Sequence, residues 1–296
     1  MEFTEVLREH RTRRGVSQLD LALRAGTSQR HVSFVESGRS RAGRGMVLRL
    51  AESLGLPLRE RNELLVLAGY APVYPESRFD SAELGPVRDA MEHVLTGHLP
   101  FPAVVVDRYG DLVAANSSFA LITGEDDPTG NGPTGKGPGE DGGRVAAELL
   151  EPPLNVYRLA LHPRGLQPRI ANFDIWAQHI LEGLRQAALR DPGPGARPAR
   201  LRAELAGYVP PRPPGADHLG FAVPLELHSP VGLLRLLTTV TTFATAVDVT
   251  VAELKLEAFL PADRATAEAL TRWSEQRGTD VAGRTGVDSK DTVKRA

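Results

Sequence analysis

The chain of 296 residues contains no cysteine, which excludes disulfide bonds, thiolate metal ligands and cysteine nucleophiles together. It also lacks a long apolar run. The most apolar stretch, residues 231–254, carries Arg235, Asp248 and many threonines, so it is not a membrane span. The chain does not open with a basic segment followed by an apolar one, so no signal peptide is expected. We therefore predict a cytoplasmic protein that has no membrane partner.

Patterns for catalysis, metal binding and nucleotide binding are missing as well. The eight histidines have neither H-x-H nor H-E-x-x-H spacing, and no G-x-S-x-G serine elbow exists. The Gly-rich residues 124–143, read as a disordered surface loop, contain the letters of two phosphate-binding motifs. No strand precedes the first, and Gly137 stands in the second where Ser or Thr must bind magnesium. The sequence thus predicts no catalytic residues, no metal ligands and no enzymatic activity.

Length and charge indicate about two domains. Residues 1–61 contain 12 arginines and 7 acidic residues, a balance of +5, whereas the remainder carries a balance of −7. A basic head on an acidic body is typical of a DNA-binding domain joined to a regulatory domain. A solvated charged surface would explain the same numbers, so charge alone does not decide between the two.

Residues 17–38 predict two short helices joined by a turn, the layout of a helix-turn-helix. We expect Ser17 to cap the first helix, Gly26 to end it and Thr27 to cap the second. Apolar residues at helical spacing on both sides extend the pattern to five short helices within residues 2–68. Gln and Arg at the exposed start of the second helix are suited to reading adenine and guanine edges.

Several spaced positions carry a family resemblance: Gln18-x-x-Leu21-Ala22, Gly26 and Val32-Ser33-x-x-Glu36-x-Gly38. Through them, roughly residues 2–70 resemble the phage-repressor-like (XRE/Cro-type) helix-turn-helix family. The likeness implies that Gln18 contacts a phosphate, that the second helix contacts base edges and that an Arg-rich loop reaches the DNA backbone. It also implies a buried ion pair between Arg11 and Glu36. The expected DNA-binding residues are Gln18, Ser28, Gln29, Arg30, Ser33, Phe34, Arg41 and Arg44.

For the two arginines of the loop, Arg41 and Arg44, simple solvation is the alternative to a phosphate contact. We expect the DNA-binding domain to occupy residues 1–71. Residues 72–98 are predicted to form a Pro-broken linker and a connecting helix. Residues 99–273 would then form a regulatory domain, and residues 274–296 a disordered tail.

The regulatory domain is predicted to mix strands and helices. Alternation and β-branched residues predict strands at 103–106, 112–115, 219–227, 233–242 and 247–258. Helical spacing predicts helices at 117–123, 173–189, 199–205 and 263–273. Residues 156–162 fit either a strand or a helix.

Three stretches of this domain carry a second resemblance: 102–107 with Asn116, 155–166 with Asn172 and Trp176, and 247–250 through 259–263. With residues 68–72 at the junction, they resemble the MmyB-like transcription regulators, whose ligand-binding domain is PAS-like. The likeness implies a multidomain fold: an N-terminal all-α, five-helix, lambda-repressor-like helix-turn-helix domain and a C-terminal α+β PAS-like domain with an antiparallel sheet. The sequence departs from the family at the Gly-rich insert and at residues 243–246, where a Gly and a Pro are expected.

The many aliphatic residues of this domain suit an apolar or amphipathic ligand, and the resemblance implies a fatty-acyl one. The candidate lining residues are Phe101, Val104, Val106, Phe119, Ile122, Tyr157, Leu159, Phe173, Trp176 and Ile180. The polar candidates for a head group are Asn155, Arg158, His162 and Asn172. Ordinary core packing is the alternative for each of them. No cofactor is expected beyond a bound fatty acid or a similar amphipathic molecule.

The resulting hypothesis is a transcription regulator that binds an inverted-repeat operator in double-stranded DNA as a homodimer. A small-molecule effector in the C-terminal domain would shift its DNA affinity. In the alternative hypothesis, the C-terminal domain serves only dimerisation or protein contacts and holds no ligand.

Overall fold

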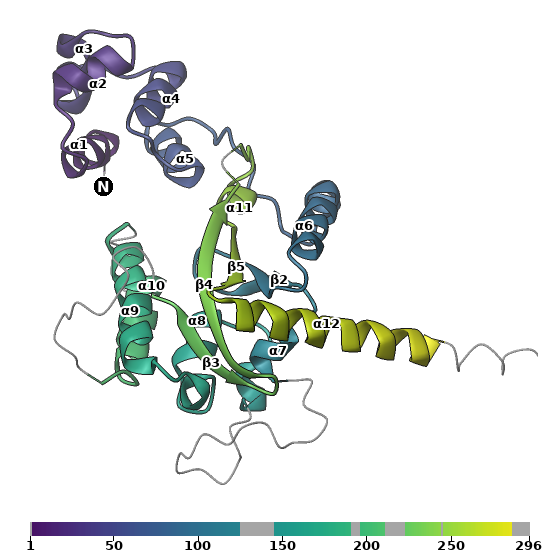
Figure 1. Ribbon diagram of the computed structural model, residues 1–296. Coiled ribbons are helices and arrows are strands. Elements are labelled where there is room, and N and C mark those ends of the chain that lie inside the picture. The colour runs from purple at the N-terminus through teal and green to yellow at the C-terminus, as the bar shows by residue number, and fades with distance from the viewer. Residues whose placement is uncertain (1, 125–144, 191–195, 211–222, 244, 286–296) are drawn as a thin grey trace, which may run out of the picture. The chain divides into compact units, whose positions relative to one another are not determined.

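The N-terminal residues form the five helices that the sequence predicted (Figure 1). They are α1 Phe3–Arg13, α2 Gln18–Arg24, α3 Gln29–Glu36, α4 Arg44–Ser53 and α5 Leu58–Leu67. The Ser17 hydroxyl accepts a hydrogen bond from the Asp20 N–H at 3.0 Å and so caps α2. Gly26, with a φ of +62°, turns the chain out of α2 in the left-handed region. The cap of α3 is Ser28, which accepts a backbone N–H at 3.1 Å, so the predicted cap at Thr27 is wrong.

The computed structural model describes residues 2–124, 145–190, 196–210, 223–243 and 245–285. The chain divides into two units. The helical unit comprises residues 1–86 and 243–253, and the sheet unit comprises residues 87–242 and 254–296. The helical unit includes residues 243–253, which the sequence assigned to the regulatory domain, because hydrogen bonds join this segment to residues 75–77.

An apolar core holds the five helices of the helical unit together. Its innermost side chains are 0% exposed and come from all five helices: Leu7, Leu21, Val32, Val35, Val47, Leu50, Leu64 and Leu65. Burying each leucine or valine is worth about 1.5–3 kcal/mol. The helical spacing of these residues in the sequence is therefore the reason that the helices pack as they do.

The helical unit also contains a short helix, α11 Val249–Ala252, in the connection between two strands of the sheet unit. The Asp248 carboxylate caps α11 by accepting the Thr250 N–H at 2.8 Å and also accepts the Ser77 N–H at 3.1 Å. The Val249 N–H donates to the Pro75 carbonyl at 2.8 Å. The predicted strand at 247–258 is therefore wrong in its first half, because the Asp248 carboxylate starts a helix there.

The sheet unit contains a five-stranded antiparallel sheet with the order β2-β1-β5-β4-β3. Its strands are β1 Ala103–Val106, β2 Leu112–Ala115, β3 Leu225–Ser229, β4 Gly232–Thr242 and β5 Lys255–Pro261. In the register, Glu257 of β5 lies opposite Val104 of β1 and Val240 of β4. Residues 219–222 of the predicted third strand lie outside the described residues.

Helices accompany the sheet, which confirms the predicted α+β class. They are α6 Gly85–Gly97, α7 Phe119–Thr123, α8 Val156–Leu161, α9 Phe173–Arg190, α10 Arg197–Ala206 and α12 Arg264–Thr285, with short 3-10 turns at Ala82–Leu84, Ala147–Leu149 and Gln167–Arg169. Helices α9 and α10 lie side by side (Figure 1). Helices α7 to α10 share one apolar core cluster with β1, β3 and β4.

Two further predictions about this unit meet a definite outcome. Residues 156–161 form a helix rather than a strand, because the Asn155 side chain caps α8. The chain is helical from 274 to 285, where a disordered tail was predicted, because α12 continues to Thr285. Residues 286–296 and nearly all of the predicted Gly-rich loop, from 125 onward, lie outside the described residues.

Candidate nucleic-acid interface and ligand cavity

The first turns of α3 present the side chains that were predicted to contact bases. Gln29 and Arg30 are exposed, and Ser33 and Phe34 are half-buried one turn further on. The Arg30 guanidinium lies 5.1 Å from the centre of the Phe34 ring, and that of Arg39 lies 6.0 Å from it. Such contacts orient exposed arginines and are worth about 0.5–1 kcal/mol. The helix therefore displays a glutamine and an oriented arginine at its exposed start.

Two of the predicted DNA-binding residues take part in the fold. The Ser28 hydroxyl caps α3, and the Gln18 Nε2 donates to Glu36 Oε2 at 2.8 Å. Glu36 also accepts from Arg11 Nε at 2.6 Å and Nη2 at 3.0 Å, and this pair is buried. The hydrogen bond to Glu36 raises the pKa of Arg11, which keeps the guanidinium charged. The implied ion pair is confirmed, and Gln18 is joined to it.

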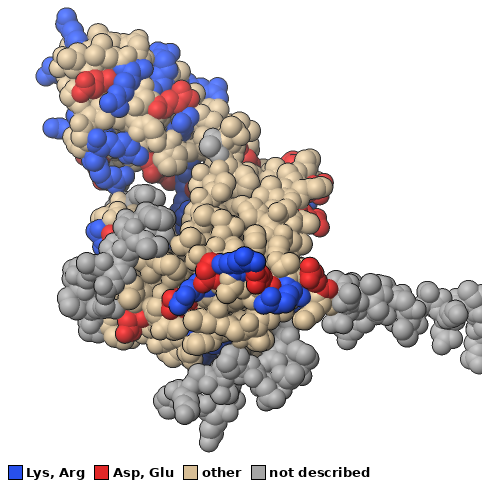
Figure 2. Space-filling view, in the orientation of Figure 1, with Lys and Arg blue, Asp and Glu red and all other residues tan. Residues whose placement is uncertain are grey.

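Arg41 and Arg44 are exposed in the segment between α3 and α4. The Arg41 guanidinium lies 5.9 Å from the centre of the Tyr70 ring and donates to the Ala68 carbonyl at 3.4 Å, while Arg44 opens α4. Figure 2 shows arginine side chains spread over the visible face of the helical unit, with fewer acidic ones among them. A surface of this kind attracts phosphates without reading a base sequence.

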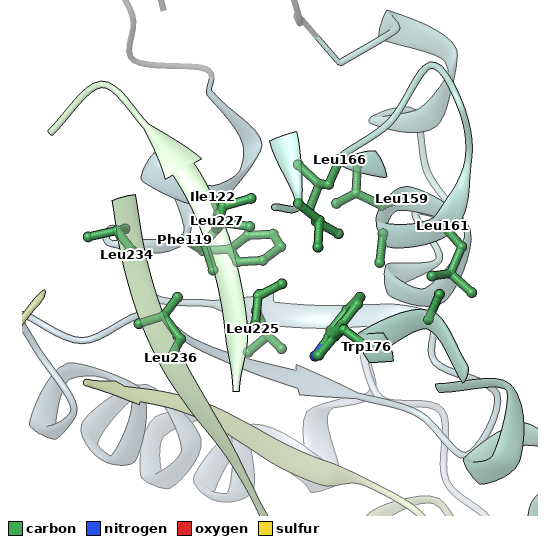
Figure 3. Packing of buried hydrophobic residues seen from close by; sticks show 14 of the residues in the cluster. Phe119, Ile122, Leu159, Leu161, Leu166, Trp176, Leu225, Leu227, Leu234 and Leu236 are labelled. Atoms are coloured by element: carbon green, nitrogen blue, oxygen red, sulfur yellow. The ribbon is translucent and has the colours of Figure 1, made fainter. Parts of the chain in front are cut away.

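The sheet unit contains a cavity of about 290 Å³. Its walls come from β1, β3, β4, β5 and helices α7 to α10. Seven of the predicted ligand-binding residues line it: Val104, Phe119, Ile122, Tyr157, Leu159, Trp176 and Ile180. Figure 3 shows Phe119, Trp176 and Leu225 lying beside one another in this interior. Small-molecule sites in proteins are mostly apolar clefts of a few hundred Å³ or more with a small number of placed polar groups.

The other seven predicted residues do not line the cavity. They are Phe101, Val106, Phe173, Asn155, Arg158, His162 and Asn172. The three apolar ones belong to the surrounding core. Of the polar ones, the Arg158 guanidinium pairs with Glu204 at 2.7 Å, and the His162 ring packs edge-on against Tyr208 at 4.9 Å between ring centres.

The two asparagines hold backbone in place. The side-chain oxygen Oδ1 of Asn155 accepts the Arg158 N–H and so caps α8. The side-chain nitrogen Nδ2 of Asn155 donates to Asp111 Oδ1 at 2.9 Å. The Asn172 amide donates to the Pro224 carbonyl at 2.7 Å, and its oxygen accepts the Glu226 N–H at 3.1 Å. Their hydrogen-bonding atoms are thus used for helix capping and for fixing the start of β3.

The polar part of the cavity wall instead includes Tyr157 and Glu257. The Tyr157 Oη lies 3.5 Å from Glu257 Oε1, and Glu257 is 9% exposed. Burial raises the pKa of Glu257, and burial together with the nearby Glu257 charge raises the pKa of Tyr157. Glu257 was not among the predicted site residues, although the alternation of β5 places Lys255, Glu257 and Phe259 on one face. An acidic residue in the middle of an apolar strand was the available signal.

Cationic side chains also line the cavity. The Arg197 Nη2 lies 2.6 Å from Asp111 Oδ2, and the Arg197 and Arg108 guanidiniums lie 4.8 and 4.5 Å from the centre of the Tyr109 ring. Lys255 of β5 completes the set. Neighbouring Asp107 lies outside the lining, and burial raises its pKa. The cavity therefore combines apolar walls with both acidic and basic groups.

Comparison with known protein families gives two matches. The description "MmyB-like transcription regulator ligand binding domain" applies to residues 87–272, and the description "Helix-turn-helix" applies to residues 7–61. The sequence matches no curated protein. Within the described residues, no helix has both the length and the apolar character that a membrane crossing requires. The same residues contain no group of three or more potential metal ligands close enough to hold an ion.

Proposed function

The chain belongs to the MmyB-like transcription regulators, and we propose that it acts in the cytoplasm as a homodimer on an inverted-repeat operator. The chain is a DNA-binding transcription regulator with a ligand-binding domain. A small apolar or amphipathic molecule, such as one with a fatty-acyl chain, would bind in the cavity and shift the affinity for DNA. We propose no enzymatic role.

The arrangement of α3 carries the DNA-binding part of the proposal. Exposed Gln29 and Arg30 lie in its first turn, where a recognition helix meets base edges in the major groove. Ser33 and Phe34 would extend this surface, and exposed Arg41 and Arg44 would contact phosphates. The Ser28 hydroxyl already caps α3, and the Gln18 amide nitrogen already donates to Glu36. In this proposal, both residues contact DNA only through their remaining hydrogen-bonding atoms.

A matched pair of double variants tests this assignment. Q29A/R30A should abolish specific binding to the operator, since each bidentate base contact is worth about 1–3 kcal/mol. R185A/Q186A removes the same two residue types from the exposed surface of α9 and should leave operator binding unchanged. Fluorescence anisotropy on the upstream region, with unrelated DNA as competitor, measures both. An unchanged sequence preference in Q29A/R30A would refute the assignment.

The chain also provides a physical link from cavity to DNA-binding helices. Strands β4 and β5 contribute five cavity-lining residues, and residues 243–253 that join these strands belong to the helical unit. There, Arg59 of α5 donates to Glu253 at 2.8 and 3.0 Å and to Glu76 at 2.5 Å. A ligand that alters β4 and β5 would therefore act on residues bonded to α5, which supports ligand control of DNA affinity.

The cavity favours a ligand over the alternative, in which the C-terminal domain serves only dimerisation or protein contacts. A domain that serves only protein contacts gains nothing from an apolar cavity lined with charged groups. Side chains that line an empty cavity lose the packing contacts that would stabilise the fold. Native mass spectrometry of the purified chain would decide the matter. A co-purifying small molecule, or a thermal shift on adding decanoic acid, supports the ligand. Neither result in any preparation would favour the interaction role.

The antiparallel sheet, opened by a strand, a turn, a strand and a short helix, supports a PAS-like assignment for the regulatory domain. We retain residues 1–71 as the DNA-binding domain and residues 99–273 as the regulatory domain. Residues 72–98 would then link the two domains. Within this linker, residues 75–77 form hydrogen bonds with the segment that contains α11.

A further inference from the structure

Glu257 places a carboxyl group in a mainly apolar cavity wall. It comes from the middle of β5, is 9% exposed and lines the cavity together with Tyr157. In the part of the chain that the structure describes, its side chain accepts a single hydrogen bond, from the Tyr157 hydroxyl at 3.5 Å. A carboxyl group can take part in several hydrogen bonds, and a buried polar group without partners is costly. Glu257 thus retains hydrogen-bonding capacity that a bound molecule can use.

The position of the Tyr157 hydroxyl is set by the backbone beneath its ring. Gly110 adopts a φ of +84°, and a Cβ atom built there would lie 2.3 Å from Tyr157 Cε2. The ring therefore rests directly on this glycine, which no larger residue could replace without displacing it. The tyrosine hydroxyl and the glutamate carboxyl form one polar spot, which helix α8, strand β5 and the backbone at Gly110 hold in place.

The charges of the cavity limit the chemistry that this spot can accept. A ligand carboxylate placed here would meet the Glu257 carboxyl, while a ligand ammonium would share the cavity with Arg108, Arg197 and Lys255. A neutral hydroxyl avoids both conflicts, because it donates one hydrogen bond and accepts another. It also suits a carboxyl group whose charged form burial disfavours.

We propose that Glu257 and Tyr157 recognise a hydroxyl group on an otherwise apolar ligand, such as a long-chain alcohol. The ligand hydroxyl donates to Glu257 and accepts from Tyr157, while its apolar chain lies against Val104, Phe119 and Trp176. This inference rests on the proposed function, since it requires that the cavity hold a ligand.

The test compares three probes of equal chain length, 1-decanol, decanoic acid and decylamine, in calorimetric titrations of the full chain. Wild-type protein should bind 1-decanol about tenfold more tightly than the other two, which corresponds to about one net hydrogen bond. E257L and Y157F should each lower the affinity for 1-decanol about five- to tenfold. E257Q retains an oxygen acceptor at the same place and should keep most of it.

The control is T238V, which removes a different polar group from the same cavity and should leave the preference for 1-decanol intact. Thermal unfolding of every variant identifies a folding defect, and Y157F decides the matter if E257L fails to fold. Equal binding of the three probes, or a preference unchanged in E257L and Y157F, overturns hydroxyl recognition while ligand binding stands. Binding of no probe at all overturns both this inference and the ligand-binding part of the proposed function.

Discussion

In the helical unit, the buried carboxylate of Glu36 meets Arg11 at 2.6 Å and Gln18 at 2.8 Å. In the sheet unit, Glu257 is buried to a similar degree but has one long contact to Tyr157 and a cavity beside it. The first carboxylate has its charge neutralised within the fold, so it stabilises a shape. The second keeps unused hydrogen-bonding capacity, so it is available to a ligand. The comparison suggests where to look for function: a buried charged residue is a candidate when its hydrogen-bonding partners are incomplete.

The apolar cores differ in the same sense. The core of the helical unit brings together side chains that are 0% exposed from five helices. The core of the sheet unit surrounds a cavity of about 290 Å³ and includes half-buried residues such as Ile180 and Phe259. A filled core fixes the position of α3, the helix that we propose contacts bases, whereas an unfilled core can respond to a molecule that enters it.

The largest expected effect concerns the buried ion pair between Arg11 and Glu36. R11A leaves the Glu36 carboxylate buried without its cation and should lower the free energy of unfolding of the helical unit by about 3–5 kcal/mol. R8A removes an exposed arginine from the same helix and should change it by less than about 0.5 kcal/mol. Urea unfolding monitored by circular dichroism, with amide exchange in α3, measures both. Equal effects of the two variants would refute a structural role for the pair.

Replacing a large core residue by alanine should destabilise the core of the helical unit more than the core of the sheet unit. L50A empties a site that is 0% exposed in the helical unit and should cost about 2–5 kcal/mol. I180A enlarges a cavity that already exists and should cost only about 1–2 kcal/mol. The measurement is urea unfolding of each variant at one pH. A larger loss in I180A than in L50A would mean that the cavity wall is packed like a closed core.

The pH dependence of stability should expose the buried carboxyl. The folded-state pKa of Glu257 is raised above the usual 4.5 by burial, against an opposing effect of Lys255 and of the Tyr157 hydrogen bond. The stability that Glu257 contributes is therefore fully present below its pKa in the unfolded chain, and it is lost as the pH rises through its pKa in the folded protein. Wild type should lose stability relative to E257Q from about pH 4.5 upward, with a slope of at most about 1.4 kcal/mol per pH unit.

Urea unfolding of wild type and E257Q between about pH 4 and pH 8 measures this difference. Neighbouring Asp107, whose pKa is also raised by burial, titrates in both proteins and cancels in the comparison. A difference in stability that is independent of pH would show that folding leaves the pKa of Glu257 unchanged, which contradicts the prediction.

The smallest effect concerns the link between the units. R59Q weakens the pairs with Glu253 and Glu76 and should reduce the change in operator affinity caused by 1-decanol by about 1 kcal/mol, or about fivefold. Affinity for DNA without ligand should change little. R78Q breaks an exposed pair with Asp80 in the neighbouring segment and serves as control. An undiminished response in R59Q would place the coupling elsewhere.

The amino-acid sequence predicts structure correctly where local signals decide it. Ser17 and Gly26 define the limits of α2, and the strand at 103–106 was predicted with its bounds because four apolar β-branched or small residues precede a polar turn. It failed by one residue at the cap of α3, because Thr27 and Ser28 are adjacent and both can cap a helix. The apolar wall of the cavity was found in part for the same reason, since apolar spacing marks buried positions.

The polar candidates show why the polar part of the site could not be predicted from the sequence. The four polar head-group candidates were the polar residues nearest the apolar lining candidates: Asn155, Arg158, His162 and Asn172. Each has a partner elsewhere in the fold, such as Glu204 for Arg158. Whether a polar side chain faces a cavity or a carbonyl depends on segments that the chain brings together later. No local pattern records that choice.

The amino-acid order was enough to decide the five helices, the capping serine of α2, the exposed Gln29 and Arg30 and the mixed character of the second unit. These features depend on helix capping and on apolar spacing, which act over a few residues. Tertiary structure alone decided that Arg59 meets Glu253 across 194 positions, that α11 joins the helical unit and that Glu257 faces Tyr157 in a cavity. The physical reason is that charge pairing and cavity shape depend on distances between remote segments, which only the folded chain defines.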